Sequence, residues 1–255
     1  MYAPRLNPWD LDDVAPDEEL PDYEADAAPA YDNAAFDEPF MSYQLRQYDR
    51  RIQLLAAYGA TTKSSYRITT NGFRLFSKKP QMEVLYTSQE MRQRMIAVVK
   101  FDNDGPLPWC PRAHFDYSDS NGHPSTHNMK APNFVDWELE IDGRSYEWMI
   151  AINPSSLVLR EKGCSVVIAR FIYSSCGTQA ARGAEVGELI VWRDAATMGA
   201  SGMDKVVCSL MVSITHLKRM GRRYTNVSGE SVRAASLTRE HIPAYRASSA
   251  GVSMI

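Results

Sequence analysis

The chain has 255 residues and a net charge of −3, a length that allows one or two globular domains. Residues 1–41 hold twelve acidic side chains and one basic side chain, a sum of −11, so the residues after them carry +8. No stretch reaches the roughly 18 apolar residues that a membrane-spanning helix needs, and the Asp- and Pro-rich start excludes a secretory signal. The four cysteines are therefore expected to be free thiols in a reducing, cytoplasmic compartment.

The first two segments of the chain differ in their pattern. Residues 1–41 are rich in Ala, Pro, Asp and Glu without hydrophobic periodicity, which is typical of a disordered arm that stays solvated or folds back onto the basic remainder. In residues 42–60, apolar side chains follow at spacings of three and four, at Leu45, Tyr48, Ile52 and Leu55. This spacing predicts a short amphipathic helix that packs on the main domain or lies on a membrane surface.

From residue 61 to residue 224 we expect one main domain, and most of it alternates between apolar and polar residues. Such alternation predicts strands with one buried face and one exposed face. Hairpin turns are expected at Asn71-Gly72, Asp142-Gly143 and Lys162-Gly163, and further strands at residues 82–88, 94–102 and 187–194. Roughly nine strands at intervals of about 8 to 15 residues indicate an antiparallel barrel or sandwich.

The segment around residues 110–127 combines a thiol with three imidazoles. Cys110, His114, His123 and His127 have the spacing C-x3-H-x8-H-x3-H, and one thiolate with three imidazoles could hold a tetrahedral zinc ion. The alternative is an exposed Pro- and Asn-rich loop between two strands, in which the four residues have no common ligand. No other cofactor is expected.

Residues 201–224 carry no charge between Lys205 and His216. The uncharged run is too short to cross a bilayer as a helix, because a helix rises only about 1.5 Å per residue. A strand is possible, since the residues also alternate, but Ser201 followed by Asp204 resembles a capping box, and cations gather at the far end. We therefore expect a helix enclosed by the strands, with almost complete burial of its apolar residues Val207, Leu210, Met211 and Ile214.

Several of these features resemble the fungal family of uncharacterised proteins in the tubby C-terminal-like superfamily, which also includes plant LURP-one-related proteins and phospholipid scramblases. The matching features are "DGRSYEW" (Asp142, Gly143, Tyr146 and Trp148), then "VVIARF", "GELIVW" and "MDKVVCSLMVSITHLKRMGRR", in that order over residues 64–223. The resemblance implies a closed barrel of about 10 to 12 strands around a buried C-terminal helix, and a domain of this size is stable without disulfides. Tubby proteins bind phosphoinositides, but none of their binding residues aligns with this sequence.

Four cations end the hydrophobic segment: Lys218, Arg219, Arg222 and Arg223. They could contact anionic lipid headgroups, or they could only complement the dipole at the end of a helix. Thr225 follows two arginines, as in the sites of basophilic kinases, and a phosphate there would reduce the positive charge. Residues 225–255 lack periodicity and are expected to form a mobile basic tail.

Three Pro-x-Tyr segments lie in the terminal regions, with Pro21 and Tyr23, Pro29 and Tyr31, and Pro243 and Tyr245. WW domains bind such Pro-rich extended peptides in aromatic grooves, so the chain could recruit a WW-domain protein. The Pro-rich composition alone could also produce the pattern.

Catalytic signatures are missing from the sequence: it has no phosphate-binding loop, no H-E-x-x-H and no G-x-S-x-G. We expect a monomeric, non-enzymatic module that binds an anionic lipid or a protein at the inner surface of a membrane. An interaction adaptor that uses the Pro-x-Tyr segments is the second hypothesis, and an unrecognised hydrolase is the third. Nucleic-acid binding is not expected, because no known module is present.

Overall fold

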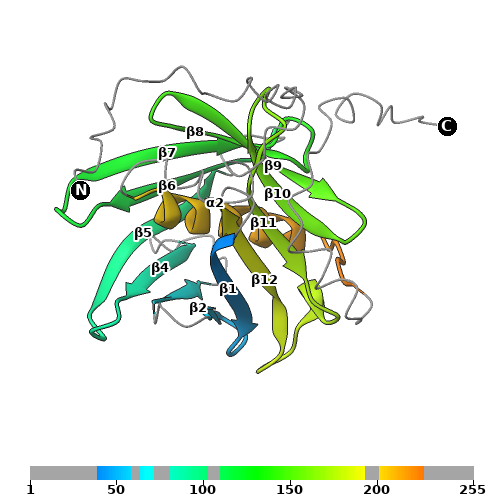
Figure 1. Cartoon of the computed structure of the whole chain (residues 1–255), viewed down its shortest axis with the longest axis horizontal. Coiled ribbons are helices and arrows are strands. Elements are labelled where there is room, and N and C mark those ends of the chain that lie inside the picture. Colours follow the sequence, from blue (N-terminus) through cyan, green and yellow to red (C-terminus); the bar gives the residue numbers. More distant parts are fainter. Residues whose placement is uncertain (1–38, 59–63, 72–80, 103–109, 193–200, 227–255) are drawn as a thin grey trace, which may run out of the picture. The chain divides into compact units, whose positions relative to one another are not determined.

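The computed structural model describes residues 39–58, 64–71, 81–102, 110–192 and 201–226 (Figure 1). They form strands β1 (Pro39–Gln47), β2 (Ile52–Ala57), β3 (Ser65–Thr70), β4 (Met82–Thr87), β5 (Gln93–Asp102), β6 (Arg112–Ser118), β7 (Pro124–Lys130), β8 (Trp137–Ile141), β9 (Arg144–Ala151), β10 (Ser156–Glu161), β11 (Val167–Tyr173) and β12 (Glu185–Trp192), the short helix η2 (Gly177–Gln179) and the helix α2 (Gly202–Arg219). Most of the expected disordered arm and most of the expected tail lie outside the described residues, and residues 39–41 of the arm belong to β1. No helix among the described residues is long and apolar enough to cross a membrane.

The twelve strands close into one antiparallel barrel, which confirms the fold class that the sequence predicts. Neighbours in the sequence are neighbours in the barrel, and β1 closes the circle by pairing with β12, from Pro39 opposite Trp192 to Arg46 opposite Glu185. Antiparallel neighbours need only short turns, which is why the short strands of this chain can alternate direction around the whole wall.

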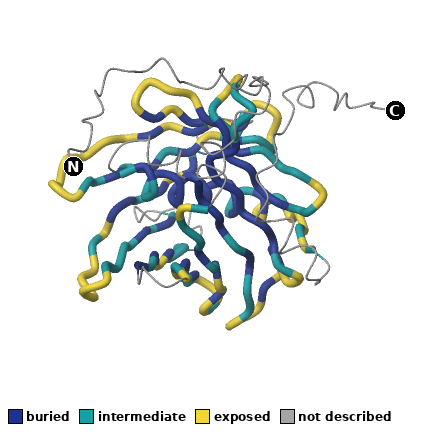
Figure 2. The backbone as a smooth tube through the Cα atoms, viewed as in Figure 1, coloured by how far each residue is buried: buried dark blue, intermediate teal, exposed yellow. Residues whose placement is uncertain are grey.

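Helix α2 runs through the interior of the barrel, with the strands around it (Figure 1). The segment is a helix and not a strand. Val207, Leu210 and Met211 are 0% exposed and Ile214 is 2% exposed, as predicted. The burial follows a simple pattern in Figure 2, in which dark blue marks the centre and yellow marks the turns. Apolar residues on the inner faces of the strands pack against the helix and form one core with it.

A polar contact inside the core fixes α2 against the wall. The indole Nε1 of Trp148 on β9 donates a 2.9 Å hydrogen bond to Oγ of Ser209, and both residues are fully buried. A buried indole N–H costs free energy when it has no acceptor, so this bond favours one position of the helix.

The prediction of an amphipathic helix over residues 42–60 is wrong. This segment forms the hairpin of β1 and β2, and the barrel begins at Pro39 instead of residue 61. Tyr43 and Leu45 point inward at a spacing of two, whereas Tyr48, which the helical pattern required to be buried, is 55% exposed in the turn. Strand β1 pairs with β12 and with β2, so tertiary contacts override the helical spacing.

The predicted hairpin turn at Asn71-Gly72 and the strand expected after it lie largely outside the described residues. Strand β3 pairs with β2 on one side and with β4, which begins at Met82, on the other. The hairpin at Asp142-Gly143 is confirmed: both residues have positive φ, 51° and 78°, as a two-residue turn requires, and β8 pairs with β9 around them.

Residues 112–118 and 124–130 form two strands of the wall, β6 and β7, where the sequence suggested a zinc-binding segment or an exposed loop. In β6 the apolar residues Ala113, Phe115 and Tyr117 alternate with polar residues and point inward. In β7 only His127 and Met129 are buried, so the apolar alternation of that strand is weak in the sequence.

Candidate functional site

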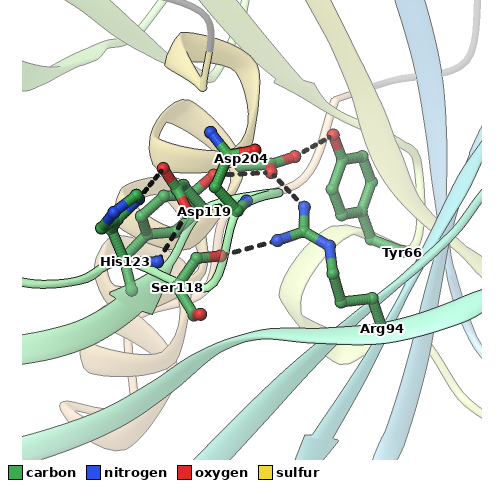
Figure 3. A network of polar contacts seen from close by, with 8 residues as sticks. Tyr66, Arg94, Ser118, Asp119, His123 and Asp204 are labelled. Atoms are coloured by element: carbon green, nitrogen blue, oxygen red, sulfur yellow. Dashed lines mark hydrogen bonds and ion pairs between the residues drawn. The ribbon is translucent and has the colours of Figure 1, made fainter.

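The most strongly connected polar site surrounds Asp204, in the first turn of α2 (Figure 3). Its carboxylate accepts hydrogen bonds from the Tyr66 hydroxyl on β3 (2.9 Å) and from the Tyr117 hydroxyl on β6 (3.0 Å). Arg94 on β5 lies 3.5 Å from the same carboxylate and donates a second, 2.7 Å bond to the Ser118 carbonyl. Three strands of the wall therefore meet the helix at one side chain.

The position of these groups follows from the alternation of each strand. Tyr66 and Tyr117 are inward residues that are 1% and 3% exposed, so their rings belong to the core while their hydroxyls reach the end of the helix. Arg94 lies near the beginning of β5, where the barrel ends, and its side chain turns toward Asp204 (Figure 3).

Burial dominates the electrostatics of this network. It raises the pKa of Asp204, and the hydrogen bonds from Tyr66 and Tyr117 and the charge of Arg94 counteract part of that rise. Burial, followed by the charge of Asp204, raises the pKa of Tyr117 to about 12 and that of Tyr66 well above its usual value. Both phenols therefore stay protonated near neutral pH and remain hydrogen-bond donors.

An open pocket of about 730 Å³ lies beside this network, and it is lined by aromatic and charged side chains together. The rings of Tyr43, Tyr66 and Tyr86 form its aromatic part, with centroid distances of 5.7 Å and 5.3 Å between successive rings. Arg92 and Glu90 pair with each other at its rim, 3.1 Å apart. The pocket could accept a small polar molecule, but Asp204 is already held by donors of the protein.

The predicted capping box at the start of α2 is not formed. Ser201 makes no capping hydrogen bond through its side chain, and Asp204 turns toward the strands instead of toward the backbone of its own first turn. One signal in the sequence pointed to such partners: Asp204 is an acidic residue at the start of a segment that must be buried, and a buried carboxylate needs donors. The sequence does not show which tyrosines and which arginine supply them.

The predicted basic cluster lies at the other end of α2. Lys218 and Arg219 form the last turn of the helix, and Arg222 and Arg223 follow directly after it; all four are exposed. Arg50, in the β1–β2 turn, lines a small pocket of about 190 Å³ together with Lys218 and Arg219. The structure thus gathers these cations, and one that the sequence did not suggest, at one end of the barrel. We call Arg50, Lys218, Arg219, Arg222 and Arg223 the basic end.

The four residues of the predicted zinc site do not converge. His114 points outward from β6 to the carboxylate of Asp102, 3.0 Å away, whereas His127 points inward from β7 and stacks on Phe115. His123 pairs with Asp119 in the turn between these strands, as Figure 3 shows. Cys110 has the carbonyl of its neighbour Pro111 as its contact.

Within the described parts of the chain, no group of three or more His, Cys, Asp or Glu side chains is arranged to hold a metal ion. Alternation explains this result, because His114 and His127 lie on opposite faces of the same sheet. On a short helix, residues four positions apart would instead have shared one side.

The Pro-x-Tyr segments at Pro21, Pro29 and Pro243 lie outside the described residues, so the recruitment of WW domains stays a prediction. Thr225 lies inside them, exposed, between Tyr224 and Asn226. Asn226 bonds to the backbone of Ser155 and of Tyr173, so the chain after α2 is held to the barrel as far as this residue. Comparison of the chain with protein-family models, with curated proteins and with solved structures gave no match.

Proposed function

We propose that this barrel is a non-catalytic binding module that binds anionic lipid headgroups through its basic end, at the cytoplasmic face of a membrane. One observation carries the proposal: among the described residues, no cation of the basic end pairs with a carboxylate. The ion pairs of the described residues all involve other cations.

Lys218 faces a neutral partner. Its Nζ atom lies 3.4 Å from the side-chain oxygen of Gln47, and that oxygen already accepts a 2.9 Å hydrogen bond from Gln53. Partial loss of hydration lowers the pKa of Lys218.

Arg219 is held in the same manner. Both terminal nitrogens of its guanidinium lie 3.2 Å from the side-chain oxygen of Gln81, and the guanidinium carbon lies 4.1 Å from the centre of the Phe101 ring. These contacts orient the cation without neutralising it, and here too loss of hydration lowers the pKa.

Oriented cations without counter-charges favour an anionic ligand, because an added phosphate gains attraction without first breaking an ion pair. Such cations contribute on the order of 1 kcal/mol each near an anionic membrane. Lys218 and Arg219 also have a structural role, because they complement the dipole of α2. That role does not explain why Arg50, which lies on a different element, is beside them.

The resemblance to tubby-like proteins gives this proposal its second support. A closed barrel around a helix is the architecture that the resemblance implies, and we propose that the chain belongs to that superfamily. Fold alone does not determine ligand, so the proposal for the basic end depends on its side chains.

Vesicle flotation of the full chain tests the proposal. The vesicles contain phosphatidylcholine alone, phosphatidylcholine with phosphatidylserine, or phosphatidylcholine with a phosphatidylinositol bisphosphate. We expect flotation with the two anionic compositions at low salt and its loss at high salt. The double variant Lys218→Gln, Arg219→Gln should bind about 30-fold more weakly, since two charges contribute about 2 kcal/mol.

The matched control is Lys100→Gln, Arg144→Gln, which removes two exposed charges from other parts of the barrel. Both of these cations pair with carboxylates, at 3.1 Å and 3.9 Å, so the control should float as the unchanged chain does. If both double variants lost binding equally, only the net charge of the chain would matter. If the chain floated with neither anionic composition, the proposal would be rejected.

A further inference from the structure

The connections that follow the odd-numbered strands all lie at one end of the barrel, because neighbouring strands run in opposite directions. Helix α2 ends there as well. Nζ of Lys218 lies 3.4 Å from the side chain of Gln47 at the end of β1, and the guanidinium of Arg219 lies 3.2 Å from Gln81, directly before β4. The basic end is therefore surrounded by these connections, among them the β1–β2, β7–β8 and β9–β10 turns.

Each of these three turns exposes a large apolar side chain. Tyr48 in the β1–β2 turn is 55% exposed, Phe134 in the β7–β8 turn is 45% exposed, and Ile152 in the β9–β10 turn is 78% exposed. We call these three side chains the apolar tips. Single exposed apolar residues are common on protein surfaces, so the meaning of the apolar tips depends on the groups that lie beside them.

Two of the apolar tips are held next to the basic end. The N–H of Tyr48 donates a 2.9 Å hydrogen bond to the Ile52 carbonyl, which closes the turn that contains Arg50. The Phe134 carbonyl lies 3.2 Å from Nε2 of His216, in the last turn of α2. Tyr48 thus shares its turn with a cation, and Phe134 lies against the helix turn from which the other cations begin.

The third apolar tip is connected to the basic end through the segment that follows α2. The N–H of Ser155, in the same turn as Ile152, donates a 2.7 Å hydrogen bond to the side-chain oxygen of Asn226. The side-chain amide of Asn226 donates a 3.0 Å bond back to the Ser155 carbonyl. This pair of bonds fixes the turn of Ile152 to the segment that carries Arg222 and Arg223.

The carboxylates of these three turns are bound by other groups of the barrel. Asp49 accepts hydrogen bonds from two backbone N–H groups, the nearer of them that of Arg51 at 2.7 Å. Asp136 accepts a 2.7 Å bond from the Asn133 side chain and a 3.3 Å bond from the Ile150 N–H. The described residues of the three turns include no other carboxylate, so the apolar tips surround cations with little free negative charge between them.

We propose that the apolar tips insert between the lipid headgroups of the membrane that the basic end binds, so that the ligand is a bilayer surface and not a soluble phosphate. This inference rests on the proposed function, because the cations bring the apolar tips to the membrane. Proteins that present apolar and basic side chains on one face bind membranes by burying apolar area and by attraction to anionic lipids. The ring and hydroxyl of Tyr48 suit the headgroup region, where tyrosine side chains gather.

Lipids with brominated acyl chains test the insertion, because bromine quenches tryptophan fluorescence only at short range. Ile152→Trp in the full chain places a reporter at an apolar tip. Met91→Trp is the matched control, since Met91 is also 78% exposed but lies in the β4–β5 turn, at the other end of the barrel. On vesicles of phosphatidylcholine and phosphatidylserine, bromination should quench Ile152→Trp more than the unchanged chain, and Met91→Trp no more than the unchanged chain.

Removal of an apolar tip should weaken binding without any change of charge. Ile152→Ser should bind the same vesicles about tenfold more weakly, because it lacks the apolar side chain that leaves water on insertion. Met91→Ser should bind as the unchanged chain does. Both positions lie in exposed turns, and equal melting temperatures of the two variants show that the barrel of each is intact.

Three results would overturn the insertion. They are quenching of Ile152→Trp no stronger than that of Met91→Trp, binding of Ile152→Ser as tight as that of the unchanged chain, and binding of soluble inositol trisphosphate as tight as that of the vesicles. If flotation still depends on Lys218 and Arg219, these results leave the proposed function in place. If the full chain does not float with anionic vesicles, both the insertion and the proposed function are rejected.

Discussion

Charged side chains have different surroundings at the two ends of α2. At its beginning, Asp204 accepts hydrogen bonds from two tyrosines and lies beside Arg94, so every charged group has a partner. At its end, Lys218 and Arg219 meet only glutamine oxygens and an aromatic ring among the described residues. A charged group that has a partner within the protein contributes to stability. An oriented charged group without an oppositely charged partner is available to a ligand.

The largest effect is expected from Asp204→Ala. The substitution leaves the hydroxyls of Tyr66 and Tyr117 without their acceptor in a buried site, and it should lower the free energy of unfolding by about 3 kcal/mol. Lys218→Ala, at the other end of the same helix, should change it by less than about 0.5 kcal/mol. Urea unfolding followed by circular dichroism measures the free energy of unfolding of both variants. Similar decreases in the two variants would contradict the comparison of the two ends.

A smaller effect is expected from the tyrosines. Tyr117→Phe removes one hydrogen bond to the carboxylate while keeping the ring, and should cost about 1.5 kcal/mol. Tyr86→Phe is the control, because its ring packs on Tyr66 while its hydroxyl has no hydrogen bond among the described residues. If both variants unfold at the same urea concentration, Asp204 does not depend on Tyr117.

The smallest effect is a dependence on pH near neutrality. Burial lowers the pKa of His127, near the beginning of α2, and of His216, near its end, below the usual 6.5. For His127 the charge of Lys205 lowers the pKa further, while the Glu140 carbonyl and Asp142 counteract part of that change. The unfolded chain therefore binds protons first as pH falls below 6.5, and stability is lost in that window.

Thermal unfolding at a series of pH values measures this loss. His127→Gln should make the melting temperature less dependent on pH between 6.5 and the lowered pKa. An unchanged slope in His127→Gln would assign the loss to other groups, with His216→Gln as the next variant to measure.

The sequence predicted the features that a single segment determines. The β8–β9 hairpin depends on Asp142-Gly143, and the burial of α2 depends on its own uncharged run, so both followed from local pattern. The error at residues 42–60 has a different origin, because a spacing of three and four around Leu45 and Leu55 coexisted with an alternation at Tyr43 and Leu45. Pairing with β12 decides between the helical and the extended conformation. In that pairing Arg46 lies opposite Glu185, a residue about 140 positions later in the sequence.

The candidate sites were predictable only where one element holds them. The basic end was found because four of its cations lie in the last turn of α2 or directly after it, whereas Arg50 joins them from the β1–β2 turn. The network of Asp204 draws on β3, β5 and β6, so its members have no spacing that a sequence could show.

The closure of β1 against β12 also sets the order in which this protein can reach its native state. The chain is synthesised from its N-terminus, so β1 cannot pair with β12 until about 140 further residues have been made. Helix α2 is synthesised later still. Contacts of such long range fold slowly. Until α2 has been synthesised, the strands have no helix to close around, and their inward apolar residues stay accessible to chaperones and to aggregation.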